Sequence, residues 1–188
     1  MAILIDSGTP ASDKNFWATT LECFADAQAL YGRNFECDIA AEPLTAKCSH
    51  YFTSHLLLEK LLDYRTSDDV RAQIREAEQV GTVCIGIDSL NLDWPEHWWC
   101  NPPFDLKPEF ITQARQQQAN GRPGMMLLPY EPLTTWWRRL LAEDVIVYEP
   151  DGRYQFYERD GATRKSGANF GCALIAFPTM KVGASPRI

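Results

Sequence analysis

Apolar and polar positions in the first 80 residues follow helical and extended spacings in turn. Residues 16–31 carry apolar side chains at helical spacing, with Thr19 and Thr20 as candidate N-terminal caps. Residues 34–41 predict a short extended run, and Asp38 sits where we expect that strand to end. Residues 55–80 are leucine-rich and then charged, and the TSDD tetrapeptide at 66–69 predicts a break between two helices.

The rest of the chain continues this alternation. Residues 81–90 predict a buried strand that ends at Asp88, and residues 124–130 predict a second one. Helices are expected over 107–120, closing at Gly121, and over 133–142. Residues 144–150 predict another strand, and the stretches 152–161 and 169–177 predict two more, joined by a polar loop.

Strands that alternate with helices predict an α/β fold with a mostly parallel sheet and helices on both faces. The two late strands in succession predict an antiparallel hairpin at the sheet edge. At 188 residues we expect one domain over 1–188. No apolar run reaches the roughly 18 residues of a membrane span, and the first residues lack the pattern of a signal peptide. We therefore expect a soluble, cytoplasmic protein.

A rigid turn stands out in the segment WWCNPPF, residues 98–104. Two consecutive prolines fix the backbone dihedral φ twice and remove two backbone donors, so the turn is extended and stiff. The amide of Asn101 in front of them is both donor and acceptor. Ligands of α/β sheets bind beyond the carboxyl ends of strands, where Asp38, Asp88, Asn101 and Pro129 are all expected. Four separate stretches thus indicate one edge of the sheet.

Charge is distributed unevenly along the chain, whose net charge is −7. Residues 1–100 hold 7 Lys and Arg against 16 Asp and Glu, whereas residues 101–188 hold 11 against 9. An acidic total argues against nucleic acid, yet the second half offers basic side chains. These residues form either a solvated surface or a local polyanion-binding face. The basic residues considered are Arg138, Arg139, Arg153, Arg159, Arg164 and Lys165.

Six cysteines are scattered through the chain without a CxxC pair. In a reducing compartment they are typical of small buried apolar residues. The CSH tripeptide at 48–50 brings a cysteine and a histidine together, but the other ligands of a zinc site are not evident. We expect no metal site.

Several motifs, in order, resemble the phage-type DNA adenine methyltransferases that use S-adenosylmethionine. The central one is the Asn-Pro-Pro-aromatic turn within DSLNLDWPEHWWCNPPF, residues 88–104. FWATTLECF (16–24) resembles the family's Trp-x-Thr-Pro opening, with Thr20 in place of the proline, and FECDIAAEPLTAKCSHYFT (35–53) resembles its next block. MMLLPYEPLTTWW (125–137) and the stretch 152–177 resemble later segments. Residues 54–85 fall outside the resemblance and are expected to be a helical insertion.

The resemblance implies a Rossmann-like methyltransferase fold and a role for each candidate residue. Asn101 and Pro102 would accept the two hydrogens of the target amino group, Pro103 would stiffen the turn, and Phe104 would stack on a flipped base. On the cofactor side the resemblance implicates Asp38, Ala40 and Asp88, with Asp93 competing for the role of Asp88. Trp17 and Thr19 line the cofactor pocket in this interpretation, although Trp17 fits the core equally well. The nucleic-acid contacts are assigned to Arg138, Arg153, Arg159, Arg164 and Lys165.

The implied reaction is methyl transfer from S-adenosylmethionine to the exocyclic amino group of adenine in DNA. Two alternatives stay open. The same chemistry could act on RNA or on a protein amide, or the chain could be a catalytically inactive DNA-binding or decoy protein with the same fold. The glycine-rich turn that is usual after the first strand of such enzymes is absent, and Ala40 and Ala41 stand there. The expected partner is DNA, in the host cytoplasm if the gene is of phage origin.

Overall fold

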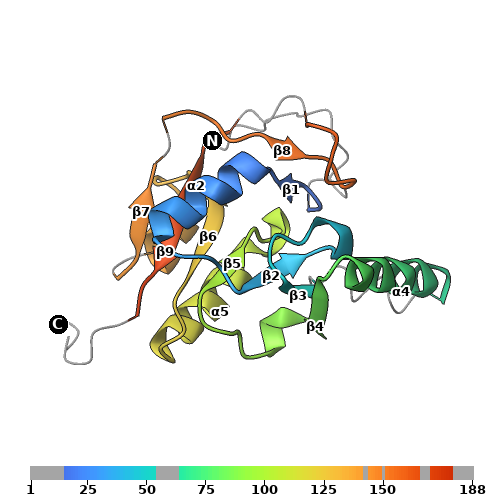
Figure 1. The fold of residues 1–188 in the computed structure, drawn as a ribbon. Coiled ribbons are helices and arrows are strands. Elements are labelled where there is room, and N and C mark those ends of the chain that lie inside the picture. Colours follow the sequence, from blue (N-terminus) through green and yellow to red (C-terminus); the bar gives the residue numbers. More distant parts are fainter. Residues whose placement is uncertain (1–14, 54–63, 142–143, 150, 166–169, 180–188) are drawn as a thin grey trace.

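The structure, a computed structural model, describes residues 15–53, 64–141, 144–149, 151–165 and 170–179. A seven-stranded sheet flanked by helices forms its centre, and a two-stranded sheet lies beside one edge (Figure 1). The strand order of the large sheet is β4-β3-β2-β5-β6-β9-β7. No helix in the described part of the chain is long and apolar enough to cross a membrane.

Five neighbouring strands of the large sheet run parallel, as the sequence predicts. They are β2 (Cys37–Ala41), β3 (His50–Thr53), β4 (Val83–Ile87), β5 (Trp98–Cys100) and β6 (Gly124–Pro129). After β2 the chain forms β3 and then β4 on one side of β2, and it then crosses back to form β5 on the other side of β2. The order of strands therefore reverses between β2 and β5, which is where open α/β sheets bind ligands.

The antiparallel part of the sheet differs from the expected late hairpin. β9 (Cys172–Phe177) runs antiparallel to both β6 and β7 (Ile146–Tyr148), whereas β8 (Phe156–Tyr157) leaves the large sheet and pairs with β1 (Ala18–Thr19). β9 is buried at all six positions, so it needs a neighbour on each side. β8 has only two residues and cannot fill such a place.

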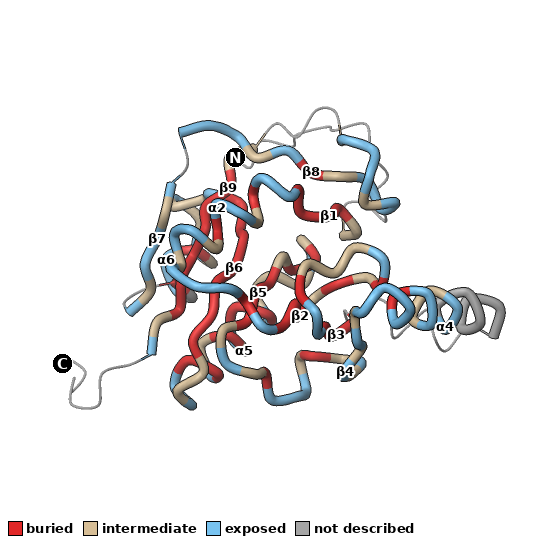
Figure 2. Tube along the Cα trace, viewed as in Figure 1, coloured by how far each residue is buried: buried red, intermediate tan, exposed pale blue. Residues whose placement is uncertain are grey.

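Helices cover both faces of the sheet, as predicted. α2 (Leu21–Tyr31) packs on one face, and α5 (Lys107–Ala119) and α6 (Thr135–Leu140) pack on the other. The side chains of β6 alternate accordingly, because Met125 and Leu127 join the cluster with α2, while Met126 and Leu128 join the cluster with α5. The buried residues in Figure 2 mark the core between these layers.

Of the two candidate N-terminal caps of α2, Thr20 is confirmed, whereas Thr19 belongs to β1. Thr20 lies at the N-cap, and its side chain accepts a hydrogen bond from the Cys23 amide at 3.4 Å. Gly32 ends the helix with φ at 82°, a left-handed conformation that favours glycine. Thr20, which replaces the family's proline, thus has a local structural task.

Two predictions for residues 54–90 are corrected. α4 (Tyr64–Gln79) runs through the TSDD tetrapeptide without a break, since polar and acidic residues suit the first turns of a helix. Residues 54–63 lie outside the described residues. β4 is an edge strand and not a buried one, because Val83, Ile85 and Ile87 are 44%, 42% and 37% exposed. The expected insertion therefore includes, at 83–85, part of a sheet strand.

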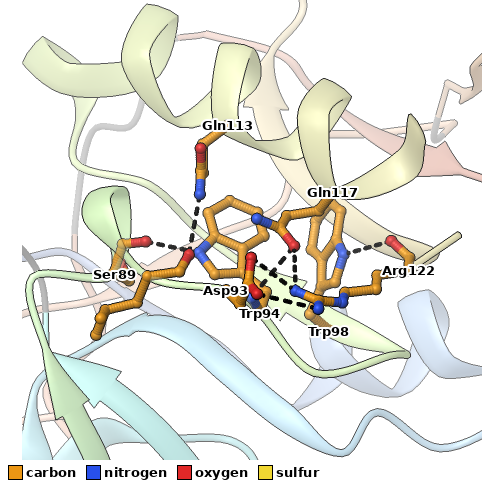
Figure 3. Close-up of polar contacts among 8 residues, drawn as sticks. Ser89, Asp93, Trp94, Trp98, Gln113, Gln117 and Arg122 are labelled. Atoms are coloured by element: carbon orange, nitrogen blue, oxygen red, sulfur yellow. Dashed lines mark hydrogen bonds and ion pairs between the residues drawn. The ribbon is translucent and has the colours of Figure 1, made fainter. Parts of the chain in front are cut away.

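The segment between β4 and β5 is held against α5 by the contacts drawn in Figure 3. The Trp94 indole donates to the Ser89 carbonyl at 2.7 Å, and Gln113 donates to the Leu92 carbonyl at 2.9 Å. Asp93 forms an ion pair with Arg122, with a closest distance of 2.9 Å. Arg122 lies two residues before β6, so Asp93 lies toward the amino ends of the strands. This position speaks against Asp93 as a ligand at the carboxyl edge, and the choice between Asp88 and Asp93 stays a prediction.

The six cysteines are free, and all but the half-buried Cys84 are buried, as the sequence predicts. Burial raises the pKa of their thiols, which keeps them neutral.

Candidate functional site

A narrow cavity lies where the strand order reverses, at the carboxyl ends of β2 and β5. It measures about 30 Å³, the room of one or two water molecules, within about 410 Å³ of space that reaches open solvent. Its lining comes from the segment 15–19, from β2 and the loop after it, and from the turn after β5. Trp17, Thr19, Asp38, Ala40 and Asn101 all line it. Five of the predicted site residues thus meet in one place.

Asp38 is the buried acidic group of this cavity, with only 4% of its surface exposed. Its carboxylate accepts hydrogen bonds from the amides of Lys47 at 3.0 Å and Ala40 at 3.4 Å. Burial raises its pKa to about 6, and the two amide donors oppose part of that rise. Asp38 does not end its strand as expected, because β2 continues to Ala41, but pairing with β5 stops at Asp38 opposite Trp99.

Lys47 brings a positive charge to the same cavity, and the sequence did not single it out. Its ammonium donates to the Thr45 carbonyl at 2.9 Å. Burial lowers its pKa, and the Asp38 carboxylate opposes that shift. Lys47 stands in the AKC tripeptide (46–48) after the extended run, where nothing local marks it as a site residue. Its position beside the cavity becomes visible only because the loop folds back so that the Lys47 amide binds Asp38. A carboxylate and an ammonium therefore line one small cavity.

The Asn101 side chain is oriented by a backbone group of the covering segment. Its Nδ2 donates to the carbonyl of Trp17 at 3.0 Å, which aims the other end of the amide away from Trp17. Within the described residues nothing donates to Asn101 Oδ1 and no amide donates to the Pro102 carbonyl, whereas Leu106 donates to the Pro103 carbonyl at 3.0 Å. Two acceptors on a rigid turn thus remain for a ligand.

Phe104 begins a short 3-10 helix, η3 (Phe104–Leu106), directly after the two prolines. The half-buried ring packs edge-on against Trp17 at 5.7 Å and against Phe170 at 5.4 Å between ring centroids. Trp17 itself is 6% exposed and stacks on Phe170 at 6.1 Å. Trp17 is therefore both a core residue and part of the cavity wall.

Residues 15–19, which include β1, line one side of the cavity, and β8 pairs with β1; we call these two segments the lid (15–19 and 156–165). Arg159 binds the Glu42 carboxylate with two hydrogen bonds, at 2.6 and 3.0 Å, and its guanidinium lies 4.4 Å from the Phe16 ring centroid. Asn15 joins the lid to the turn through two hydrogen bonds with Asp105, at 2.8 and 3.1 Å. The sequence did not indicate Asn15 or Glu42, because each acts through a partner more than 85 residues away.

Asp88 does not reach this cavity. It follows β4 with a positive φ of 64° and accepts a hydrogen bond from Asn91 at 2.6 Å. It lines a separate, open hollow with residues at the start of α5, among them Pro108 and Gln113. Asp88 thus lies at the predicted edge of the sheet but does not line the cavity of Asp38, and its role in cofactor binding stays a prediction.

The predicted DNA contacts divide into two groups. Three of them pair with carboxylates of the chain: Arg159 with Glu42, Arg164 with Glu22 and Lys165 with Glu158. Arg138 and Arg153 are exposed, and the Arg138 side chain donates to the Pro132 carbonyl at 3.3 Å. These ion pairs neutralise the three cations of the lid. A count of basic residues in the sequence therefore overstates the positive charge that the lid offers to DNA.

Fold and site together define an α/β protein with a ligand cavity at the reversal of strand order, beside a preorganised pair of acceptors, as in group-transfer enzymes. Comparison with known proteins specifies this class. A family model described as DNA N-6-adenine-methyltransferase (Dam) matches residues 82–185, and the chain belongs to this family. A relative named DNA N-6-adenine-methyltransferase, from Haemophilus phage HP1 (strain HP1c1), is 22% identical over 178 residues, which cover 93% of this chain and 85% of the relative.

Proposed function

We propose that this protein transfers the methyl group of S-adenosylmethionine to the exocyclic amino group of adenine in DNA. The observation that carries the assignment of the site is the Asn101 amide beside the cavity of Asp38: the Trp17 carbonyl holds its Nδ2, and no described residue donates to its Oδ1. The matched family region includes the Asn101–Phe104 turn. The strand order, with its reversal between β2 and β5, supports a Rossmann-like methyltransferase fold.

The charges of the cavity fit the amino-acid end of S-adenosylmethionine. Asp38 suits the α-ammonium group and Lys47 suits the α-carboxylate, so the buried pair offers each charge of the ligand a partner. Small side chains at Ala40 and Ala41 leave the backbone accessible there. Because the cavity holds only one or two waters, the lid and its Arg159–Glu42 ion pair have to move outward before the cofactor enters.

The chain's own task in the reaction is to position the amino group of the base. The bound cofactor supplies an electrophilic methyl group. The lone pair of the adenine amino nitrogen is delocalised into the ring, which makes it a poor nucleophile. Asn101 Oδ1 and the Pro102 carbonyl accept its two hydrogens and favour a tetrahedral nitrogen, while Phe104 stacks on the flipped ring.

The reaction is tested by incubating the purified protein with tritiated S-adenosylmethionine and unmethylated DNA, RNA or protein. We expect label only in DNA, on the adenine amino group, and sequencing of methylated positions after expression in a methylation-free host gives the target site. Label only in RNA or protein would favour the first alternative. DNA binding without any transfer would favour the inactive binding protein.

Cofactor affinity is expected to depend on the charge of Asp38. Since burial raises its pKa to about 6, the carboxylate that binds an ammonium group is lost as pH falls through that value. We expect the dissociation constant to rise by up to about tenfold per pH unit below pH 6 and to be flat above pH 7. Calorimetry from pH 5 to 8 measures it, and Asp38→Asn should remove the dependence and weaken binding at least about tenfold at pH 7.5.

The same raised pKa has an opposite effect on the stability of the cofactor-free protein. A folded pKa above the unfolded one contributes stability below the unfolded value near 3.8, and this contribution disappears as pH rises through about 6. Wild type should therefore lose stability relative to Asp38→Asn between pH 4 and 6.

The affinity measurement also has an outcome that contradicts the proposed contact. If the affinity of wild type for the cofactor stays constant over pH 5 to 8, Asp38 does not contact the cofactor.

DNA affinity is expected to fall steeply with salt through Arg138 and Arg153, which form no ion pair among the described residues. Replacing Arg138 and Arg153 by glutamine should reduce the slope of log affinity against log salt by about 2, since each phosphate contact contributes about 0.9. The triple change of Arg159, Arg164 and Lys165 should reduce it less per residue, because each is already paired. Fluorescence anisotropy at several salt concentrations measures both, and an unchanged slope in the double variant excludes Arg138 and Arg153 from the DNA-binding face.

A further inference from the structure

Leu133 is the most exposed large apolar side chain among the described residues, at 82%. It follows β6 and therefore lies at the carboxyl edge of the sheet, the edge that carries Asn101. At this exposure the Leu133 side chain makes little contact with the rest of the described chain. This one stands beside the site of a DNA-modifying family.

The backbone that carries Leu133 is a rigid turn. Thr134 donates through its amide to the Glu131 carbonyl at 3.0 Å and through its hydroxyl to the same atom at 2.7 Å. Pro132 occupies the second position of this turn, where its fixed φ is favourable. The Trp136 indole donates to the Glu131 carboxylate at 2.7 Å and fixes the turn on α6. Leu133 is thus presented outward by a defined structure.

Two chains of contacts connect this turn to Phe104. The Lys107 ammonium lies 3.5 Å from the Phe104 carbonyl oxygen and 5.2 Å from the centroid of the Trp136 ring. On the other side, the backbone amide of Tyr130 donates to the Gly171 carbonyl at 2.8 Å, and Phe170, which precedes Gly171, packs on the Phe104 ring. The turn that carries Leu133 is therefore connected to Phe104, the residue proposed to stack on the flipped base, through Lys107 on one side and Phe170 on the other.

Positive charge accompanies the leucine. The Arg138 side chain donates to the Pro132 carbonyl at 3.3 Å, which places its cationic group at the turn, and Arg139 beside it is also exposed. Guanidinium groups in such positions suit phosphates of a DNA backbone. An apolar tip beside a cationic group matches the chemistry of side chains that enter a base stack while their neighbours hold the backbone.

We propose that Leu133 enters the duplex beside the target adenine and fills the space that the base leaves when it turns out toward Phe104. This inference rests on the proposed function. An enzyme that acts on a base in a duplex must unpair and unstack it, and an apolar side chain in the vacated space opposes its return. Leu133 then acts on the extrahelical state of the DNA and makes no contact with the cofactor.

The test compares Leu133→Ala on two duplexes of the mapped target sequence, one fully paired and one with an abasic site opposite the target adenine. On the paired duplex we expect kcat/KM to fall at least about tenfold, because the flipped state loses its support. On the abasic duplex, where the target adenine has no pairing to lose, we expect activity within about twofold of wild type. Leu133→Met should retain most activity on both.

Val80→Ala is the matched control, since Val80 is 79% exposed but precedes β4 at the amino edge of the sheet. It should behave as wild type. A second readout, 2-aminopurine fluorescence at the target position, should rise on binding to wild type and less on binding to Leu133→Ala. Equal losses on both duplexes, or no loss, overturn the role of Leu133. A wild type with neither methylation nor a fluorescence rise on DNA refutes the proposed function itself.

Discussion

Replacing Asn101 by alanine is expected to lower the rate of methyl transfer by about a hundredfold or more, with little change in cofactor affinity or melting temperature. The lost group is one of two acceptors that hold the adenine amino hydrogens. The effect should appear in kcat, because the hydrogen bonds strengthen as positive charge develops on the nitrogen. Single-turnover measurements with saturating cofactor and DNA report this step.

The structure explains why Asn101 can be removed without loss of the fold. Within the described part of the chain its side chain makes one hydrogen bond, from Nδ2 to the Trp17 carbonyl, and the residue is half-buried. The two prolines after it keep the turn rigid whatever stands at position 101. Loss of that single bond costs about 1 kcal/mol, which is small against the stability of a domain.

The matched control is Asn120→Ala, because Asn120 is an exposed asparagine at the far end of α5. It should leave transfer unchanged. If Asn101→Ala retains more than about a tenth of wild-type activity, the turn has no role in the transition state. If Asn101→Ala unfolds, the amide has a structural function that the single hydrogen bond does not indicate.

Local patterns in the sequence correctly predicted most individual elements of the fold. α2 with its Thr20 cap and α5 closing at Gly121 follow from short-range spacing and capping, and β6 follows from its buried apolar run. The pairing of strands depends on contacts between distant residues, and here prediction failed. β8 pairs with β1, about 140 residues earlier in the chain, and no local feature of residues 152–161 indicates that partner.

The candidate site was predictable to a similar extent. The turn at Asn101 is a local feature, so its stiffness and its acceptors follow from the sequence alone. The position of Lys47 depends on how the loop after β2 returns to Asp38, and that of Glu42 on a bond to Arg159. Ion pairs of this kind also decide how much charge remains for DNA, which a count of basic residues cannot show.

Replacing Phe104 by alanine is expected to reduce kcat/KM by about 10- to 100-fold, since stacking of a base on an aromatic ring contributes roughly 1–3 kcal/mol. The ring also packs against Trp17 and Phe170, so the substitution leaves a gap beneath the lid. These two effects differ in their readouts. Loss of stacking weakens DNA with a flipped base and leaves cofactor affinity intact, whereas a displaced lid weakens cofactor binding as well.

Phe104→Trp and Phe170→Leu separate the two effects. Phe104→Trp keeps an aromatic face for the base and should retain part of the activity, while Phe170→Leu disturbs the same aromatic cluster without touching the proposed stacking face. We expect cofactor affinity, measured by calorimetry, to change more in Phe170→Leu than in Phe104→Trp. Among these three variants, we expect the 2-aminopurine signal of a flipped base to be lost only in Phe104→Ala. If Phe104→Ala keeps that signal and instead loses cofactor affinity, Phe104 supports the lid and is not the platform for adenine.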